Sequence, residues 1–359
     1  MPSLKSLPIE SVRAAYFDSE ALREPPYRLY RIVTPKGRFY YTMENNVPEL
    51  YMGVTSMLAM VIPKPQGLIK WIADMGWEKS QAYMIERSWY GTLLHKEIEH
   101  FIINKLYDFT IVDQTVDEYC AENSYIIDRE KWIEDLRKDM LAFVKFCHDY
   151  NVRPIAVEIM LIHPEGYSGT IDIIAYMDID VEGDWGEKYK SGPRKDEVKL
   201  TKKKVKMLCV IDVKSTRKGT NHEEKDVQLE AYKQLIEHNF PDLIIDRIFN
   251  WSPKDWTGIE PTYNLNDKTN SVDMQKFYAW IRVAQIELDK KSIVLGEITG
   301  IVNLGQDPCD LYSERTLEEY IVDYHEKRFA EKEEIVYLKE MPREEEEERK
   351  EMLREHNEE

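Results

Sequence analysis

Ile211-Asp212-Val213-Lys214 ends the apolar run Met207–Val213, and the fold assignment depends on this stretch. The run predicts a buried β-strand, whose side chains alternate between two faces, so Asp212 and Lys214 project from one face about 7 Å apart. A carboxylate beside an ammonium group can hold a divalent cation and position the water that attacks a phosphate. The pair alone is a weak signal, because a simple salt bridge has the same spacing.

Two apolar runs upstream each carry one acid. Asp172 lies in Ile171-Asp172-Ile173-Ile174-Ala175, and Glu158 lies in Ala156–Ile162. Burying a carboxylate among aliphatic side chains is costly unless a metal ion or a cationic group pairs with it. A single such acid would most simply pair with a basic residue, but three acids together with Lys214 favour a metal site.

Two predicted helices add polar side chains to this set. The stretch Asp226–Leu235 reads as a helix in which Gln228 and Tyr232, four residues apart, share a face. The stretch Trp89–Ile102 also reads as a helix and contains His95. A lone helical histidine is more often a packed or surface residue than a ligand, so His95 gains meaning only from the other residues.

Together these residues resemble the PD-(D/E)xK nuclease superfamily, in its RecB-like exonuclease branch. The matching motifs, in chain order, are G-T-x-x-H-x-x-I-E at 91–99, G-x-I-D at 169–172, D-x-K at 212–214 and Q-x-x-x-Y at 228–232. The segments at 37–41 and 53–58 are similar to the entry region of the phage and mitochondrial genome-maintenance exonucleases of this branch. The resemblance covers roughly residues 27–250, and four degenerate motifs in the right order are specific.

The resemblance implies an α/β fold with a restriction-endonuclease-like core, a mixed central β-sheet flanked by helices, elaborated by an N-terminal hairpin and helices. It implies Mg²⁺ or Mn²⁺ held by Asp172, Asp212, the Val213 carbonyl and His95. Glu158 would complete this coordination or orient a water molecule. Lys214 would orient or deprotonate the attacking water, and Gln228 with Tyr232 would position the scissile strand or Lys214.

One departure from the family pattern is the distance between the two motif acids. Asp172 and Asp212 are 40 positions apart, where relatives have a short hairpin, and a different acid paired with Asp212 would displace Asp172 from the site. We expect the extra segment, about 178–206, to extend the hairpin as a solvent-exposed β-arm. Its lysines either keep a mobile hairpin soluble or form a basic flap on DNA. The candidate DNA-binding residues are Lys199, Lys202, Lys203, Lys204, Ser215 and Thr216.

Composition fits a globular chain but gives mixed signals about nucleic acid. The net charge of −18 opposes phosphate binding. However, the tail 331–359 holds 13 acids against 6 basic residues, whereas 199–225 holds 9 basic residues against 3 acids. The four scattered cysteines (Cys120, Cys147, Cys209 and Cys309) suggest reduced thiols and no iron–sulfur cluster. No apolar run is long enough for a membrane span, so we expect a cytoplasmic protein, with an organelle not excluded.

We expect four regions along the chain. They are a β-hairpin segment at 1–52, a helical region with the histidine motif at 53–150, the nuclease core at 151–334 and an acidic tail at 335–359. Within them we expect a hairpin at 27–43, helices at 128–150, 272–289 and 313–333, and a strand at 243–251. Trp71 reads as part of an amphipathic core helix, although Lys64 and Lys70 nearby suit nucleic acid.

The expected function is metal-dependent hydrolysis of DNA phosphodiester bonds, most simply by an exonuclease in recombination, repair or phage DNA processing. DNA is the expected partner, with a recombination or replication protein as a second one. The alternatives are a structure-specific endonuclease of the same fold and a non-catalytic scaffold that binds DNA or protein. The spacing of His95 and His100 excludes an H-E-x-x-H zinc site, and no G-K-[ST] motif supports a P-loop.

Overall fold

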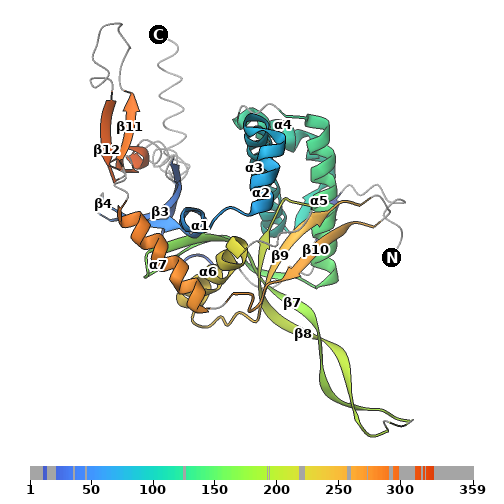
Figure 1. The fold of residues 1–359 in the computed structure, drawn as a ribbon. Helices are drawn as coiled ribbons and strands as arrows, with labels where there is room; N and C mark the ends of the chain where they lie inside the picture. The colour runs from blue at the N-terminus through green and yellow to red at the C-terminus, as the bar shows by residue number, and fades with distance from the viewer. Residues whose placement is uncertain are drawn as a thin grey trace, which may run out of the picture.

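The structure is a computed structural model in which strands form a central sheet with helices on both faces (Figure 1). The expected α/β class, a mixed sheet flanked by helices, is therefore confirmed. The described residues are 11–13, 22–34, 37–44, 47–123, 127–191, 193, 195–217, 223–256, 260–272, 274–290, 294–298, 312–316, 318–319 and 321–326.

The elements of the described residues alternate between strands and helices along the chain. The strands are β1 (Ser11–Arg13), β2 (Tyr30–Thr34), β3 (Gly37–Glu44), β4 (Val47–Gly53), β5 (Leu106–Asp108), β6 (Arg153–His163), β7 (Tyr167–Lys188), β8 (Val198–Val213), β9 (Arg247–Lys254), β10 (Thr262–Asp267), β11 (Val294–Ile298) and β12 (Tyr312–Thr316). The helices are α1 (Val54–Val61), α2 (Gln66–Met75), α3 (Trp77–Asn104), α4 (Val112–Asn123), α5 (Arg129–Asp149), α6 (Glu223–Asn239) and α7 (Met274–Lys290), with a short 3-10 helix η2 (Phe109–Ile111).

The central sheet has eight strands in the order β10-β9-β8-β7-β4-β3-β2, and β6 also pairs with β7. The pairs β4–β7 and β8–β9 are parallel, while the remaining pairs of this sheet are antiparallel. The N-terminal strands β2 to β4 thus share one sheet with the strands that carry the predicted site acids. Two small antiparallel pairs, β1–β5 and β11–β12, lie outside this sheet.

Each face of the sheet buries its own hydrophobic core. One core packs α1, α6 and α7 on the sheet, through residues such as Met57, Leu235 and Phe277. The second core packs α3, α4 and α5 on the opposite face, with Phe143 and Trp251 in edge-to-face contact at 5.2 Å between ring centroids. Both faces of β7 and β8 are covered where these strands cross the body of the protein, which explains why their sequences there are nearly continuous apolar runs.

Most of the elements expected from the sequence are present. The hairpin at 27–43, the helix at 128–150, the helix at 272–289 and the strands carrying Glu158, Asp172 and Asp212 are confirmed as β2–β3, α5, α7, β6, β7 and β8. The helical stretch after Gly53 breaks near Pro63 and Pro65 as expected, and breaks again at Gly76, whose φ of 87° ends α2. The expected tail at 335–359 lies outside the described residues.

Two expectations about secondary structure are wrong. Residues 312–316 form strand β12 rather than the start of the helix expected at 313–333, because β11 offers an edge that supplies their backbone hydrogen bonds. Residues 318–319 and 321–326, further along this range, are helical as expected. The strand expected to begin at Leu243 begins at Arg247. Just before β9, Asp246 forms two hydrogen bonds with the backbone of β8. Its N–H donates to the Leu208 carbonyl, and its carboxylate accepts from the Leu208 N–H.

The segment between the two motif acids forms a long two-stranded arm, as expected, which projects away from the body (Figure 1). The register places three arm lysines opposite acids, in the pairs Asp178–Lys206, Asp180–Lys204 and Glu182–Lys202. Alternation puts Ile179, Val181 and Val205 on the other face. The arm is thus an acid–lysine ladder backed by a thin apolar face, rather than an unbalanced basic surface.

Glycine at 169 allows helix α6 to pack close to β7. A Cβ atom at this position would lie 2.7 Å from a ring carbon of Tyr232 and 3.2 Å from a methyl group of Leu235. Carbon atoms essentially never approach to 2.7 Å, so any larger side chain would push α6 away from the sheet. The glycine of the G-x-I-D motif is therefore required by packing between the strand and the helix that carry predicted site residues.

We predict that Gly169→Ala lowers the free energy of unfolding by about 1–3 kcal/mol, because overpacking a filled core costs this much. Urea denaturation followed by circular dichroism measures the change. Gly67→Ala in α2 is the matched control. Nothing lies within 4 Å of a Cβ atom there, so this helical substitution should stabilise by up to about 1 kcal/mol. Equal stability of the two variants would contradict the packing argument.

Candidate functional site

The three predicted acids lie in one row across neighbouring strands. Glu158 on β6 sits opposite Asp172, between the pairs Val157–Ile173 and Ile159–Ile171. Asp172 on β7 is next to Asp212 on β8, one position beyond the pair Ile173–Ile211. Strands in a sheet lie about 4.8 Å apart, so the register brings the carboxylates together although they are distant in sequence.

His95 of helix α3 joins this row from above the sheet. Its Nδ1 lies 3.0 Å from a Glu158 carboxylate oxygen and 3.6 Å from an oxygen of Asp172, while its Nε2 lies 3.2 Å from the Val213 carbonyl oxygen. The structure therefore brings together the metal-binding residues that the family resemblance implied. These contacts place His95 at the row of acids and at the end of β8 rather than in an apolar core.

The hydrogen bonds around Asp172 and Asp212 link the row to the end of β8. One Asp172 oxygen accepts a 2.7 Å hydrogen bond from the Val213 N–H, which orients the carboxylate. Lys214 contacts Asp212, with 2.5 Å between its Nζ and Oδ2. The side chain of Asp212 is only 2 % exposed, so Lys214 neutralises a buried charge in addition to any chemical role.

The backbone at Glu158 has an unusual conformation for a strand. Its φ is 45°, in the left-handed region that a residue with a Cβ atom rarely adopts. Such a conformation costs on the order of 1–3 kcal/mol and tends to persist at functional sites. The turn of the backbone at this point aims the Glu158 carboxylate at His95. Nothing in the sequence around Glu158 indicates this strain.

Burial and crowded charges shift the pKa values of the site. Burial lowers the pKa of His95, but the neighbouring Asp172 and Glu158 carboxylates outweigh it and raise this pKa to about 9. Burial raises the pKa of Asp172 to about 7, His95 opposes the rise, and Asp212 and Glu158 add to it. Several acids therefore crowd around one histidine, and a bound cation would neutralise the charge that these acids share.

Gln228 and Tyr232 of α6 lie against the same acids. The Gln228 side-chain amide donates a 2.6 Å hydrogen bond to the Tyr232 hydroxyl, and both side chains line the cavity that contains Asp172 and Asp212. Burial raises the pKa of Tyr232 well above its usual range, and the two aspartates add to this effect. Tyr232 is therefore a neutral hydrogen-bonding group that cannot act as a phenolate.

The donor atoms fit a divalent cation. One ligand atom each from His95, Glu158 and Asp172 lie within 4.8 Å of one another, and Asp212 is adjacent in the row. Carboxylate oxygens, one imidazole nitrogen and a backbone carbonyl are hard or borderline donors, which suit Mg²⁺ or Mn²⁺. The chemistry of these donor atoms therefore fits a divalent cation at this cluster.

The acids line a cavity of about 490 Å³ whose rim holds residues that the sequence analysis missed. Arg31 and Arg38 come from the N-terminal hairpin, and Ser88 and Lys96 come from α3. Arg31 reaches Thr170, two residues before Asp172, at 3.5 Å. Only the tertiary structure joins this hairpin to the site, because Arg31 and Arg38 precede Asp172 by more than 130 residues. The candidate DNA-binding residues Lys199, Lys202, Lys203, Lys204, Ser215 and Thr216 do not line this cavity.

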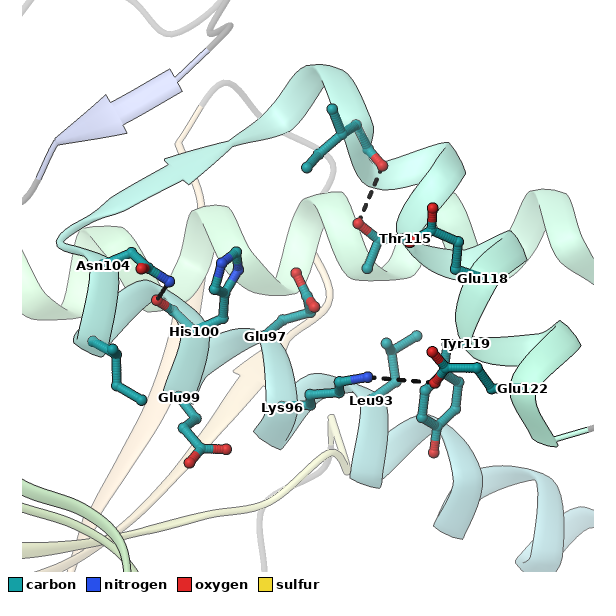
Figure 2. Close-up of a pocket in the computed structure, with 12 residues that line it drawn as sticks. Leu93, Lys96, Glu97, Glu99, His100, Asn104, Thr115, Glu118, Tyr119 and Glu122 are labelled. Atoms are coloured by element: carbon teal, nitrogen blue, oxygen red, sulfur yellow. Dashed lines mark hydrogen bonds and ion pairs between the residues drawn. The ribbon is translucent and has the colours of Figure 1, made fainter. Parts of the chain in front are cut away.

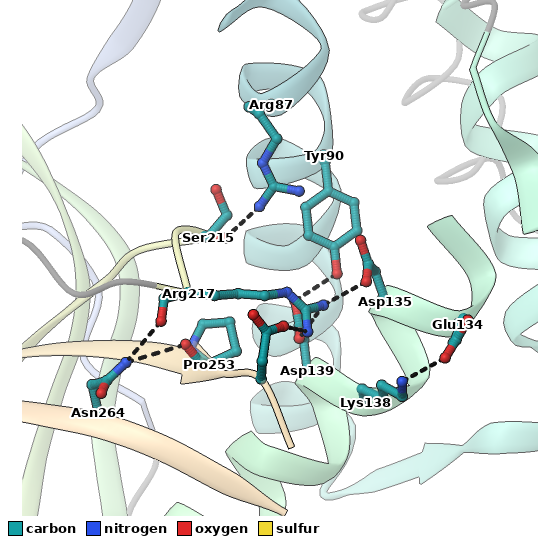
Figure 3. A network of polar contacts seen from close by, with 11 residues as sticks. Arg87, Tyr90, Glu134, Asp135, Lys138, Asp139, Ser215, Arg217, Pro253 and Asn264 are labelled. Carbon is teal, nitrogen blue, oxygen red and sulfur yellow. Dashed lines mark hydrogen bonds and ion pairs between the residues drawn. The ribbon is translucent and has the colours of Figure 1, made fainter. Parts of the chain in front are cut away.

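The segment that follows Lys214 is clamped between helices (Figure 3). Arg87 of α3 donates a 2.5 Å hydrogen bond to the Ser215 carbonyl, and Gly91 leaves room for Ser215, whose hydroxyl oxygen would lie 3.1 Å from a Cβ atom there. Arg217 pairs with Asp135 at 2.7 Å and with Asp139 at 2.9 Å on α5. The clamp ties the end of β8 to the helix that carries His95.

A buried carboxylate anchors this clamp. Asp139 is 1 % exposed and also accepts a 2.7 Å hydrogen bond from the Tyr90 hydroxyl of α3. Burial raises the pKa of Asp139 to about 7, although Arg217 opposes this shift. Arg217 lies three residues after the D-x-K motif, so the sequence shows a basic residue close to the end of β8. The sequence does not show that its acidic partners lie on α5.

A second hollow of about 400 Å³ lies between α3 and α4 (Figure 2). Lys96 and Glu99 line both hollows. Burial raises the pKa of Glu97 in this hollow. Lys96 pairs with Glu122 of α4 at 3.6 Å. This ion pair joins α3 to α4, and we assign it a structural role.

No protein-family model matches the sequence, and no curated protein resembles it significantly. Among the helices that the structure describes, none has the length and apolar character needed to cross a membrane. Three of the four cysteines, Cys120, Cys147 and Cys209, are free thiols, and Cys309 lies outside the described residues.

We predict that Arg217→Met lowers the free energy of unfolding by about 3–5 kcal/mol, because it leaves Asp139 buried without its cation. Chemical denaturation of the purified variant measures the loss. Asp255→Ala is the matched control, since Asp255 pairs with the same guanidinium at 2.9 Å but is 80 % exposed. We expect the control to cost less than about 1 kcal/mol. Similar losses in both variants would show that the clamp is not a buried anchor.

Proposed function

We propose that the chain is a metal-dependent deoxyribonuclease that hydrolyses phosphodiester bonds, most simply from a DNA end. The observation that supports this proposal best is the convergence of His95, Glu158 and Asp172 on one point beside the Asp212–Lys214 pair. Recombination, repair or phage DNA processing would be the setting. The restriction-endonuclease-like core and the superfamily assignment rest on the motif resemblance and belong to this proposal.

Each residue has a defined task in the proposed reaction. A bound Mg²⁺ or Mn²⁺ would polarise the scissile phosphate and lower the pKa of the attacking water. His95, Glu158, Asp172 and Asp212 would hold that ion, and the Val213 N–H would keep Asp172 oriented. Lys214 would align the attacking water and offset the negative charge that builds on the phosphate. By analogy with the family, the products would carry 5′-phosphate and 3′-hydroxyl ends.

The cavity rim offers cationic groups for the DNA backbone in spite of the acidic net charge. Arg31 and Arg38 line the same cavity as the acids and Lys214, although they are far from Lys214 along the chain. Phosphates on either side of the scissile bond would contact these groups. The arm lysines are a weaker choice, because the register sets acids opposite Lys202, Lys204 and Lys206 and thereby offsets their charges.

One face of α3 offers a path for a single strand that leaves the cavity. Trp77, Gln81, Met84, Ser88 and His95 recur at spacings of three, four or seven residues and so form one stripe along the helix. Ser88 and His95 line the cavity, and Trp77 lies about 16 Å beyond Ser88. The Trp77 ring is 65 % exposed. Exposed aromatic rings beside a phosphate-binding groove are stacking platforms for unpaired bases.

Helix α2 strengthens this interpretation of the α3 face. None of its residues is fully buried, and Trp71 makes an edge-to-face contact with Tyr83 of α3 at 5.6 Å between ring centroids. The expectation that Trp71 belongs to a core helix is therefore wrong, because α2 lies on the surface of α3 rather than under it. Ile69 and Met75 of α2 and Trp77 of α3 are also exposed apolar side chains, a type of residue that interaction sites carry.

We predict that the Asp212→Asn and Lys214→Ala proteins lose cleavage of end-labelled DNA in Mg²⁺ or Mn²⁺ by a factor of at least about 100. Asp212→Asn removes the charge of a metal ligand, and Lys214→Ala removes the group that aligns the water. Glu134→Gln and Lys138→Ala are matched controls. This exposed pair on α5 has the same 2.5 Å separation and should not affect the rate.

Full cleavage by either site variant would contradict the assignment. Calorimetry with Mn²⁺ separates a nuclease from a scaffold, because a scaffold would show no binding below millimolar concentrations and no change in Asp172→Ala. His95→Gln should lose at least about tenfold in metal affinity, with partial rescue at high Mn²⁺. A covalently closed DNA circle separates the two enzyme modes, since only an endonuclease cuts it.

We predict that Trp77→Ala weakens binding of a short oligothymidine by about 1–3 kcal/mol, the contribution of one stacked base. Fluorescence anisotropy with the Lys214→Ala protein as background measures affinity without cleavage. Trp185→Ala is the control, because Trp185 is also exposed, at 36 %, but lies on the arm. A loss of self-association instead of DNA affinity in Trp77→Ala would assign this face to a second copy of the chain.

A further inference from the structure

Asn250 extends the row of site acids to a fourth strand. It lies on β9, directly beside Asp212 in the parallel pair of β8 and β9. Its neighbours Phe249 and Trp251 point into the core under α3 and α5, so Asn250 points to the other face of the sheet, the face of α6. The row across the sheet therefore runs Glu158, Asp172, Asp212, Asn250.

The side chain of Asn250 is buried without a hydrogen-bond partner. It is 1 % exposed, and neither its amide nitrogen nor its carbonyl oxygen bonds to any described residue. More than nine in ten buried polar groups do have partners, so an orphaned amide calls for a specific explanation. Ser252, two residues further along β9 and 2 % exposed, has its partner in the Asn264 amide at 3.2 Å.

The Asp212 carboxylate next to Asn250 has a complementary need. Its Oδ2 atom is buried, and its contact is the Lys214 ammonium group at 2.5 Å. An asparagine can donate twice through its nitrogen, whereas an ionised carboxylate oxygen can only accept. Strand spacing of about 4.8 Å puts the amide within reach of Asp212 directly or through one bridging molecule.

We propose that Asn250 is a positioning residue that holds the Asp212 carboxylate in its metal-binding orientation. This proposal rests on the nuclease function proposed above. When Lys214 turns from Asp212 toward the attacking water, Asp212 Oδ2 loses its contact and the Asn250 amide donates to it. The carboxylate then keeps its orientation while Lys214 acts on the substrate. The orphaned amide is thus a group whose partner becomes available only in the working state of the site.

The decisive variant is Asn250→Leu, which has a similar size and no polar atoms. Removing an orphaned buried amide should leave the denaturation midpoint unchanged or raise it, since nothing in the fold bonds to it. If Asn250 orients Asp212, the same variant should lose about 10- to 100-fold in Mn²⁺ affinity or in kcat on DNA, the usual effect of removing a group that orients a metal ligand. KM for DNA should change little, because Asn250 does not line the cavity.

Ser252→Ala is the matched control on the same strand and face. It removes a satisfied hydroxyl, so it should lower the denaturation midpoint and leave kcat and Mn²⁺ affinity at the wild-type values. Asn250→Ser, which keeps a donor, should recover part of the activity lost in Asn250→Leu. If Asn250→Leu fails to fold, Asn250→Ala takes its place, because a smaller side chain fits the same space.

The outcomes separate this proposal from the function on which it rests. Wild-type protein that neither binds Mn²⁺ nor cleaves DNA would overturn the nuclease assignment. Active wild-type protein together with an equally active Asn250→Leu or Asn250→Ala variant would overturn the role of Asn250 alone. A variant that loses stability and keeps kcat and metal affinity would show that Asn250 is a structural residue of the core.

Discussion

The fold of this protein is organised around the need to neutralise carboxylates on buried strands. Glu158, Asp172 and Asp212 lie side by side in the centre of the sheet, where an uncompensated charge would cost several kcal/mol. His95 and Lys214 supply the positive charge that the protein itself can offer. The two helical layers must therefore deliver one imidazole to one point on the sheet, and the close packing around Gly91 and Gly169 serves this placement.

The Arg217 clamp explains how a helix and a strand from different layers keep that placement. Tyr90 and Arg87 on α3 contact Asp139 and the Ser215 carbonyl, and Arg217 closes the network onto α5. His95 is five residues, or less than two helical turns, beyond Tyr90. A displacement of the clamp would therefore move the imidazole relative to Asp172. Stability and site geometry share the same contacts here.

Several features of the site are locally unfavourable, and they lie close together. The left-handed backbone of Glu158, the orphaned amide of Asn250 and the crowding of Asp172 by two other carboxylates each raise the energy of the folded chain. A sequence selected for stability alone would remove them. Their concentration along one row of the sheet supports a chemical role for this row, whereas the Lys96–Glu122 contact is an ordinary ion pair and the arm sets its lysines opposite acids in the strand register.

The sequence by itself determined the strands and the main helices, because apolar runs with one acid each and amphipathic helical stripes are local patterns that follow from side-chain periodicity. The candidate site residues were selected by their match to the family motifs, since periodicity alone does not distinguish His95 from a packed or surface histidine. The arm was also predictable, because a segment with so few apolar residues cannot pack into a core.

Only the tertiary structure decided what depends on strand order and register. Placing β4 next to β7 brings Arg31 and Arg38 to the cavity, and pairing β9 with β8 puts Asn250 beside Asp212. The same register sets acids opposite the arm lysines, and the free edge of β11 turns residues 312–316 into a strand. These outcomes rest on hydrogen bonds between segments far apart in the chain, and such bonds leave no periodic trace in the sequence.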